Sequence, residues 1–151
     1  MLEFRFIAGN NGYEITKNMR NDIFGNELEY QNVCDEHEED SYHFVGYDKT
    51  QIISAARLTE TGDKTFNIAY VCVRENYRRQ YVGDLMVKAL ADKAVALGGT
   101  VLMARVPVSV CGFFEFEGFE RCDAEFIEDN RSQVIMKKDL LKIQQCRGCE
   151  R

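Results

Sequence analysis

One stretch of the sequence decides the fold: FNIAYVCV (residues 66–73), RENYRRQYVG (74–83) and DLMVKALADKAVALGG (84–99). The first part is a near-continuous apolar run, which predicts a strand covered on both faces. In the last part apolar residues recur at helical spacing on one face, which predicts an amphipathic helix from about Val82. Gly98 and Gly99 are expected to end that helix, because the left-handed residue just past a helix favours glycine.

The turn between this strand and this helix is suited to an anion. A helix that begins directly after a strand directs its unpaired N–H groups, and the positive end of its dipole, at the turn. Arg78 and Arg79 add full positive charges and paired hydrogen-bond donors. A phosphate or pyrophosphate is the expected guest. The alternative is an ordinary strand–helix connection with solvated arginines.

Two motifs resemble those of the GNAT acyl-CoA N-acyltransferases. Residues 70–83 are similar to the acetyl-CoA motif of that family, an apolar strand followed by Arg/Gln-x-x-Gly-x-Gly/Ala, with Arg78, Tyr81 and Gly83 at the motif positions. Tyr81 replaces the first glycine, so a side chain stands where the family has none. The stretch FFEFEGF (113–119) is similar to the second motif, an aromatic pair followed by Gly-Phe.

The whole chain predicts an α/β protein with a mixed sheet. Strands are expected over 2–8, 42–47, 52–58, 101–106, 119–127 and 133–136, and further helices over 13–24, ended by Gly25, and over about 110–117. The resemblance implies the GNAT-like acyl-CoA N-acyltransferase fold, with about six to seven strands and about four helices. Residues 1–138 would form a single acetyltransferase domain, and residues 139–151 a polar C-terminal tail.

Composition narrows the class of protein. A chain of 151 residues with 45% hydrophobic and 29% charged residues is typical of one soluble globular domain. Neither a membrane-spanning run nor a signal peptide is recognisable, so we expect a cytoplasmic protein without a membrane partner. The net charge of −6 argues against a nucleic-acid partner.

The six cysteines are most simply free thiols, and Cys72 is expected to pack in the core. A zinc site built from Cys34 and His37 together with Cys146 and Cys149 is the alternative. Both pairs lie in segments without regular structure, and the Cys146/Cys149 pair lacks the strand–helix setting of a redox motif. We therefore expect no metal.

Residues 34–40 are the most charged segment, with Glu36, Glu38 and Glu39 among five carboxylates. A run this dense is usually a solvated loop. The functional alternative is that it attracts a cationic amine, or supplies a base for which Glu36 is a candidate. His43 is expected to be a core or cross-strand residue rather than a catalyst.

The resemblance implies an acetyl-CoA-dependent N-acetyltransferase, in which a primary amine attacks the thioester directly. The cofactor-binding residues carried over are Val71, Cys72 and Val73 for the pantetheine arm, Arg78, Arg79, Gln80, Tyr81, Val82, Gly83 and Asp84 for the pyrophosphate, and Phe113 and Phe114 at the thioester end. The oxyanion is expected to take a backbone N–H from the central strand. The acceptor would be a small-molecule or peptide amine, and a homodimer stays open because members of the family are frequently dimers.

The catalytic acid is not identified by the sequence. The tyrosine that often serves this role in the family corresponds to Phe114 here. Tyr77, Tyr81, Ser109 and Cys111 could replace it, and Cys111 could instead act as a nucleophile. A non-catalytic CoA-binding or interaction module is therefore the second hypothesis, and an unrelated nucleotide-binding α/β protein the third.

Overall fold

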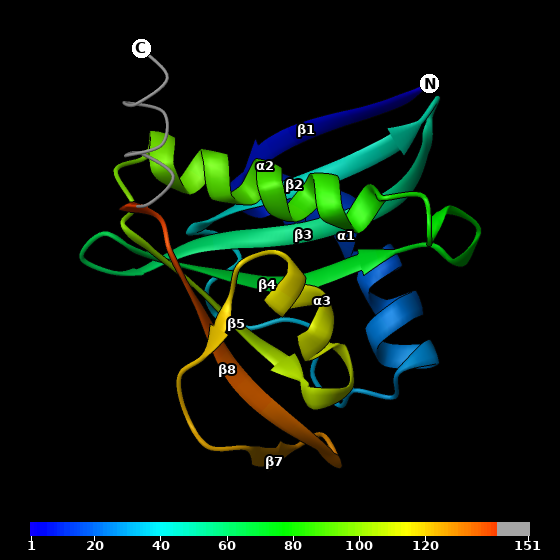
Figure 1. Cartoon of the computed structure of the whole chain (residues 1–151). Helices are drawn as coiled ribbons and strands as arrows, with labels where there is room; N and C mark the ends of the chain where they lie inside the picture. Colours follow the sequence, from blue (N-terminus) through cyan, green and yellow to red (C-terminus); the bar gives the residue numbers. More distant parts are fainter. Residues whose placement is uncertain (142–151) are drawn as a thin grey trace. The chain divides into compact units, whose positions relative to one another are not determined.

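The computed structural model describes residues 1–141 and confirms the α/β class (Figure 1). Within those residues an eight-stranded mixed sheet has the order β1-β2-β3-β4-β5-β8-β6, with β7 paired to β8. The strands are β1 (Leu2–Ala8), β2 (Ser41–Asp48), β3 (Gln51–Gly62), β4 (Thr65–Val73), β5 (Val101–Pro107), β6 (Glu120–Arg121), β7 (Phe126–Glu128) and β8 (Arg131–Asp139). The α-helices of this described part are α1 (Gly9–Arg20), α2 (Val82–Ala96) and α3 (Cys111–Phe116).

The chain forms two compact units, and each is described by itself. Unit 1 consists of Met1–Thr59 and Ala69–Met86, and unit 2 of Glu60–Ile68 and, among the described residues, 87–141. The strand count exceeds the expectation because the segment expected as one strand over 119–127 is split into β6 and β7. Both pieces pair with β8, which therefore extends well beyond the expected 133–136.

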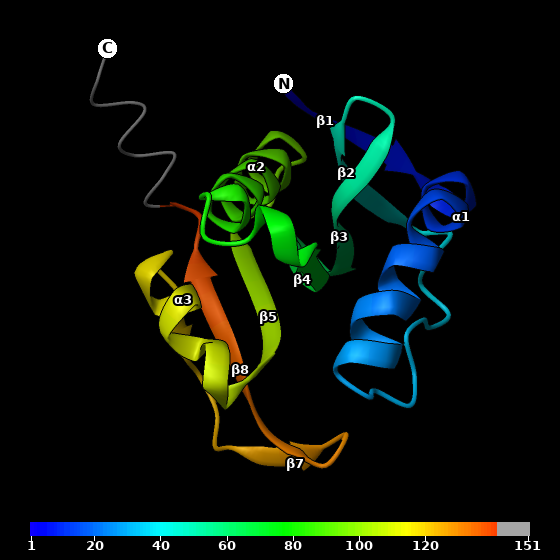
Figure 2. The ribbon, with the colours of Figure 1, turned by 90° about the vertical axis from the view of Figure 1, so that its right-hand side faces the viewer.

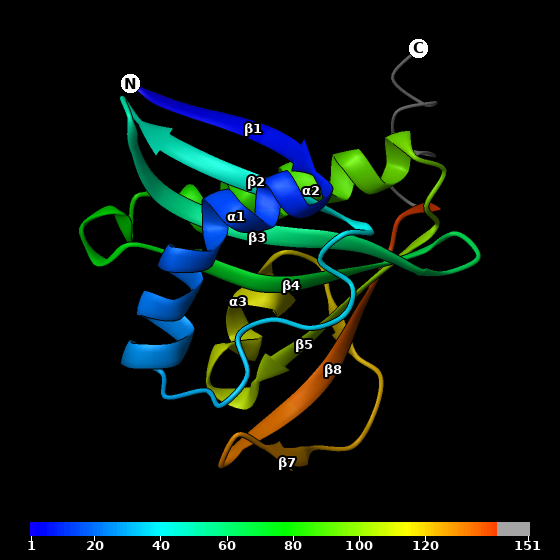
Figure 3. The same ribbon diagram turned by 180° about the vertical axis from the view of Figure 1, so that it is seen from behind.

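In unit 1, β1 and β2 form an antiparallel pair, and α1 lies against them (Figure 3). The helix approaches the strands closely at Gly12. A Cβ atom there would lie 2.5 Å from the carbonyl oxygen of Ile7 and 2.6 Å from the His43 ring. A residue without a side chain is therefore required for α1 to pack on this pair of strands.

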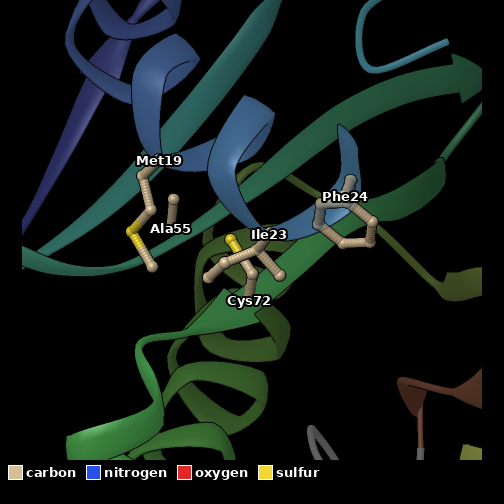
Figure 4. Close-up of a cluster of buried hydrophobic side chains, with 5 residues drawn as sticks. All are labelled: Met19, Ile23, Phe24, Ala55 and Cys72. Carbon is tan, nitrogen blue, oxygen red and sulfur yellow. The ribbon is translucent and has the colours of Figure 1, made fainter. Parts of the chain in front are cut away.

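The core of unit 1 joins four segments (Figure 4). Met19 of α1, Ile23 and Phe24 of the following turn, Ala55 of β3 and Cys72 of β4 are all buried in one cluster. Only 5% of Cys72 is exposed, which confirms its expected packing role. The first helix is thereby held against the central strands by apolar contact.

The prediction that the first helix ends at Gly25 was wrong. After α1 the chain continues as a π-helical turn over Asn21–Glu27, and it passes through Gly25. The N–H of Leu28 donates to the carbonyl of Ile23 at 2.8 Å, the wider spacing of a π-turn. This widening keeps Ile23 and Phe24 in the core, so packing overrides the local signal of a glycine.

In unit 2, β4 runs parallel to β5 from Thr65↔Val101 to Ile68↔Ala104, and β5 is antiparallel to β8. The expected end of α2 is confirmed. Gly98 has φ +87°, and the Gly99 N–H donates to the carbonyl of Ala94 at 2.7 Å. This bond and the left-handed glycine form a Schellman cap.

The expected short helix after β5 is also present, as a 3₁₀ turn over Val108–Val110 that leads into α3. Figure 2 shows α3 beside β8. No helix within residues 1–141 is both long and apolar enough to cross a membrane. Leu140 is fully buried after β8, and residues 142–151, with Cys146 and Cys149, lie outside the described residues.

Candidate functional site

The expected anion site is a loop that unit 1 holds at both ends. At its start the Arg74 N–H donates to the carbonyl of Ile53 in β3 at 2.9 Å. At its end α2 begins with Val82, and the Leu85 N–H donates to the carbonyl of Tyr81 at 3.0 Å. In an α-helix the first N–H groups lack the carbonyl group four residues earlier that the later ones use, so the start of α2 directs backbone donors toward the loop.

Two residues of the loop are left-handed. Arg79 and Tyr81 both have φ +63°. Tyr81 occupies the place of the first glycine in the motif, so the backbone keeps a glycine-type conformation although the residue is bulky. Where left-handed residues alternate with right-handed ones, neighbouring N–H groups can point into one concavity and bind an anion there. This backbone is compatible with the expected diphosphate site, whose role stays a prediction.

The arginines of the loop have different partners. Arg78 donates through Nε to the carbonyl of Val73 at 2.7 Å and forms a forked pair with Glu27 at 2.7 and 3.0 Å. That hydrogen bond lowers the pKa of Glu27 and raises the pKa of Arg78. Arg74 pairs with Asp22 at 3.4 Å. The side chains of Arg74 and Arg78 thus both connect the loop to the π-helical turn. Arg79 is exposed, and no carboxylate within residues 1–141 pairs with it.

Tyr77, a candidate acid, forms a hydrogen bond with the last residue of β2. Its hydroxyl donates to Asp48 Oδ2 at 2.5 Å. This hydrogen bond to a carboxylate raises the pKa of Tyr77. The side chain is therefore neutral and already engaged, and its catalytic role stays a prediction.

The central strand β4 carries a left-handed residue at Tyr70, with φ +53°. A left-handed residue within a strand turns the neighbouring N–H and C=O groups out of the ladder, as in a bulge. Val71, Cys72 and Val73 follow it directly, and burial raises the pKa of the Cys72 thiol to about 12. Cys72 can thus serve a ligand only through its main chain. This irregularity is compatible with the expected main-chain donor in β4, whose role stays a prediction.

A buried charge network lies beside Tyr70. Glu38 Oε2 accepts hydrogen bonds from Arg20 of α1 at 2.7 Å and from Arg57 of β3 at 3.0 Å. Arg57 also forms a forked pair with Asp35 at 2.6 and 2.9 Å. Both guanidinium groups lie over the Tyr70 ring, at 4.2 Å for Arg20 and 5.1 Å for Arg57. Burial and the charge of Asp35 raise the pKa of Tyr70 to about 12.

The interpretation of residues 34–40 as a solvated loop was wrong for Glu38, which is only 6% exposed. Arg20 and Arg57 are themselves buried, and a buried guanidinium requires a counter-charge. Glu36 and Glu39 are exposed, as a solvated loop predicts. The sequence reasoning missed Arg20, Arg57 and the role of Glu38, because residues this far apart in the chain give no periodic signal.

His43 is a core residue, as expected. Its side chain is fully buried, and Nε2 lies 3.0 Å from the carbonyl oxygen of Glu38. Arg20 can only donate to the other ring nitrogen, at 3.5 Å, so the proton is assigned to Nε2. Burial lowers the pKa of His43, and the charge of Arg20 adds to this effect.

We expect the free energy of unfolding to decrease in acid. Burial lowers the pKa of His43 below its ordinary 6.5. Burial alone would raise the pKa of Asp35, but hydrogen bonds from Arg57 and the His37 N–H outweigh it and lower that pKa below 3.8. The unfolded chain therefore binds protons more readily, and stability is lost first below about pH 6.5 and further below about pH 3.8.

Urea unfolding at a series of pH values measures this dependence. His37 is the matched control, because it is exposed. The variant His37→Asn should keep the loss of stability between about pH 7 and about pH 5. Equal stability of the unmodified protein at these two pH values would contradict the assignment to His43.

The remaining predicted site residues belong to unit 2. Phe114 is buried and packs edge-on against Phe113 and Phe119, with ring centroids 5.2 and 5.3 Å apart. Cys111 is buried at the start of α3, and Arg121 Nη2 donates to its sulfur at 3.0 Å. A cation next to this thiol was not visible in the sequence. The catalytic role of Cys111 stays a prediction.

The structure thus brings residues 71–84 together in unit 1, next to the Tyr70 network. Phe113, Phe114 and Cys111 all belong to α3 in unit 2, and Glu36 is exposed in the 34–40 loop. Within the described part of the chain, no three His, Cys, Asp or Glu side chains gather as metal ligands would. Of the four candidate zinc ligands, Cys146 and Cys149 lie outside that part.

Known proteins resemble this chain in sequence and fold. YyaT, an uncharacterized protein of Bacillus subtilis (strain 168), is 24% identical over 103 residues, which cover 68% of this chain and 69% of that protein. ElaA of Escherichia coli has 17% identity and a TM-score of 0.83, over 92% of this chain and 100% of that chain. An acyl-CoA N-acyltransferase from Pseudomonas aeruginosa has 16% identity and a TM-score of 0.78, over 91% and 99%.

A family model adds the decisive comparison. The model described as the acetyltransferase (GNAT) domain matches residues 14–140, which include β4, the loop of residues 74–81 and α2. Similarity in the solved structures is a similarity of fold, whereas this match runs through the sequence of the site. The chain therefore belongs to the GNAT acetyltransferase family.

Proposed function

We propose that the protein is an N-acetyltransferase that moves the acetyl group of acetyl-CoA to a primary amine of a small molecule or peptide. The observation that supports this proposal is the loop before α2, where the left-handed Arg79 and Tyr81 and the exposed side chain of Arg79 directly precede the start of the helix. Their donors match the diphosphate of coenzyme A in charge and in hydrogen bonding.

The reaction would proceed by direct attack. The amine loses a proton and attacks the thioester carbon, a tetrahedral oxyanion forms, and the C–S bond breaks to release the CoA thiolate. The left-handed backbone at Tyr70 supports a main-chain N–H in β4 as the donor to the oxyanion. Val71 and Val73 would bond the pantetheine arm through their main chains, beside that donor.

The leaving group requires little help from an acid. A thiol has a pKa of about 8.5, so its thiolate leaves near neutral pH more readily than an alkoxide would. Tyr70 is a poor acid for this step, because its pKa of about 12 lies well above that of the thiol. The absence of a hydroxyl at Phe114 is thus compatible with activity. Cys111 and Tyr77 remain the candidate acids, although the hydrogen bond to Asp48 raises the pKa of Tyr77 and makes it a weaker acid than an ordinary tyrosine.

The buried charge network beside Tyr70 limits which carboxylates of residues 34–40 could attract a cationic amine. Asp35 and Glu38 are already neutralised by Arg57 and Arg20, so they offer little charge to a cationic acceptor. Glu36 remains exposed in the same loop, near His37 at 3.5 Å. Of the carboxylates proposed to attract the amine, the exposed Glu36 and Glu39 are therefore the ones that we retain, and Glu36 stays the candidate for accepting its proton.

Two measurements test this proposal. Acetyl-CoA should raise the melting temperature, whereas ATP and NAD should not, and a panel of primary amines should release free thiol from acetyl-CoA in the presence of the protein. A longer acyl-CoA serves as a comparison for the donor. Stabilisation by CoA without thiol release for any amine would favour the second hypothesis, a non-catalytic CoA-binding module. Stabilisation by ATP or NAD alone would contradict both.

A further inference from the structure

Tyr81 is the most unusual residue of the anion loop. Its side chain is 82% exposed, although it is one of the large apolar residues of unit 1. Its backbone is left-handed, a conformation that a bulky residue adopts only at a cost in free energy. In the family motif this position is a glycine, for which the same conformation carries no such cost.

Packing does not explain this tyrosine. A side chain with so much exposed surface gains little from burial, and within residues 1–141 its ring makes no aromatic contact and its hydroxyl no hydrogen bond. The ring therefore contributes little to folding, while the backbone conformation disfavours its presence. A role toward a ligand would account for both facts.

The position of Tyr81 indicates which part of a ligand its ring would meet. The residue directly precedes Val82, the first residue of α2, and it follows Arg79 by two positions. Its side chain therefore leaves the backbone at the edge of the anion position. A group attached to a bound diphosphate, and extending into solvent from it, would pass this ring.

We propose that Tyr81 stacks on the adenine ring of the acyl-CoA and thereby selects a nucleotide-bearing acyl carrier. This inference rests on the proposed function, because it takes the diphosphate to lie at the start of α2. An aromatic ring is suited to this role, since stacking needs only the flat face of the base and tolerates an exposed setting. The side chain at the glycine position is then a recognition element of this chain rather than a defect of the motif.

The test compares three proteins and two ligands by titration calorimetry. The ligands are CoA and 4′-phosphopantetheine, which lacks the nucleotide. Tyr81→Gly, which restores the residue of the family motif, should weaken CoA binding by roughly 5- to 150-fold, the usual range for one stacked base. The same substitution should leave the affinity for 4′-phosphopantetheine unchanged. Tyr81→Phe, which keeps the ring, should bind CoA as the unmodified protein does.

The outcomes separate this inference from the proposed function. If the unmodified protein binds CoA and Tyr81→Gly binds it equally or more tightly, stacking is contradicted and the proposed function stands. An equal loss for both ligands would also contradict stacking, because it would mean that the substitution disturbs the phosphate position. If the unmodified protein does not bind CoA, the proposed function fails and this inference fails with it.

Discussion

Replacing Glu38 by alanine is expected to lower the free energy of unfolding by about 3–5 kcal/mol. The carboxylate is buried between Arg20 and Arg57, at 2.7 and 3.0 Å. Its removal leaves two guanidinium groups in a site that water reaches poorly. Among residues 1–141, Asp35 is then the one carboxylate still paired with them, through Arg57. The cost arises from these uncompensated charges rather than from the net contribution of the pair, which is smaller.

Urea unfolding measures this effect, and Glu39→Ala is the matched control. Glu39 is the next residue in the chain and is exposed, so its removal should change the stability by less than about 0.5 kcal/mol. Glu38→Gln should lie between the two, because the amide keeps one acceptor but loses the charge. Equal stabilities of Glu38→Ala and Glu39→Ala would show that the network does not hold unit 1 together.

Replacing Arg79 by alanine should weaken the binding of CoA by roughly 10- to 150-fold. This range corresponds to the loss of one charge-assisted hydrogen bond, worth about 1.5–3 kcal/mol. The guanidinium is exposed beside the start of α2, so the substitution should leave the stability of the free protein nearly unchanged. Titration calorimetry with CoA and thermal unfolding without it measure the two quantities.

Arg78→Ala and Arg5→Ala are the comparison variants. Arg78 holds Glu27 and the carbonyl of Val73, so its removal should lower both stability and affinity by loosening the loop. Arg5 is an exposed arginine of β1, and its removal changes the net charge equally without touching the loop. Unchanged affinity in Arg79→Ala with lost affinity in Arg78→Ala would assign the phosphate contact to Arg78 instead.

The sequence predicted the fold well where local patterns decide it. The apolar run of β4, the amphipathic α2 and its glycine end were all confirmed, since periodicity and a left-handed cap act within a few residues. The single strand expected over 119–127 and the helix end at Gly25 were wrong. In both places tertiary contacts decide: pairing with β8 in one case, and the burial of Ile23 and Phe24 in the other.

By itself, the sequence determined the class of fold, the strand, loop and helix of residues 66–99 and the family, because these follow from short-range patterns and from two motifs. Only the tertiary structure decided how individual charges are used. It engaged Arg78 with Glu27, left Arg79 exposed, and buried Glu38 between two arginines. The partners in these pairs lie 18 to 51 residues apart in the chain. Ion pairing depends on distance in space and on burial, and neither can be read from the order of the residues.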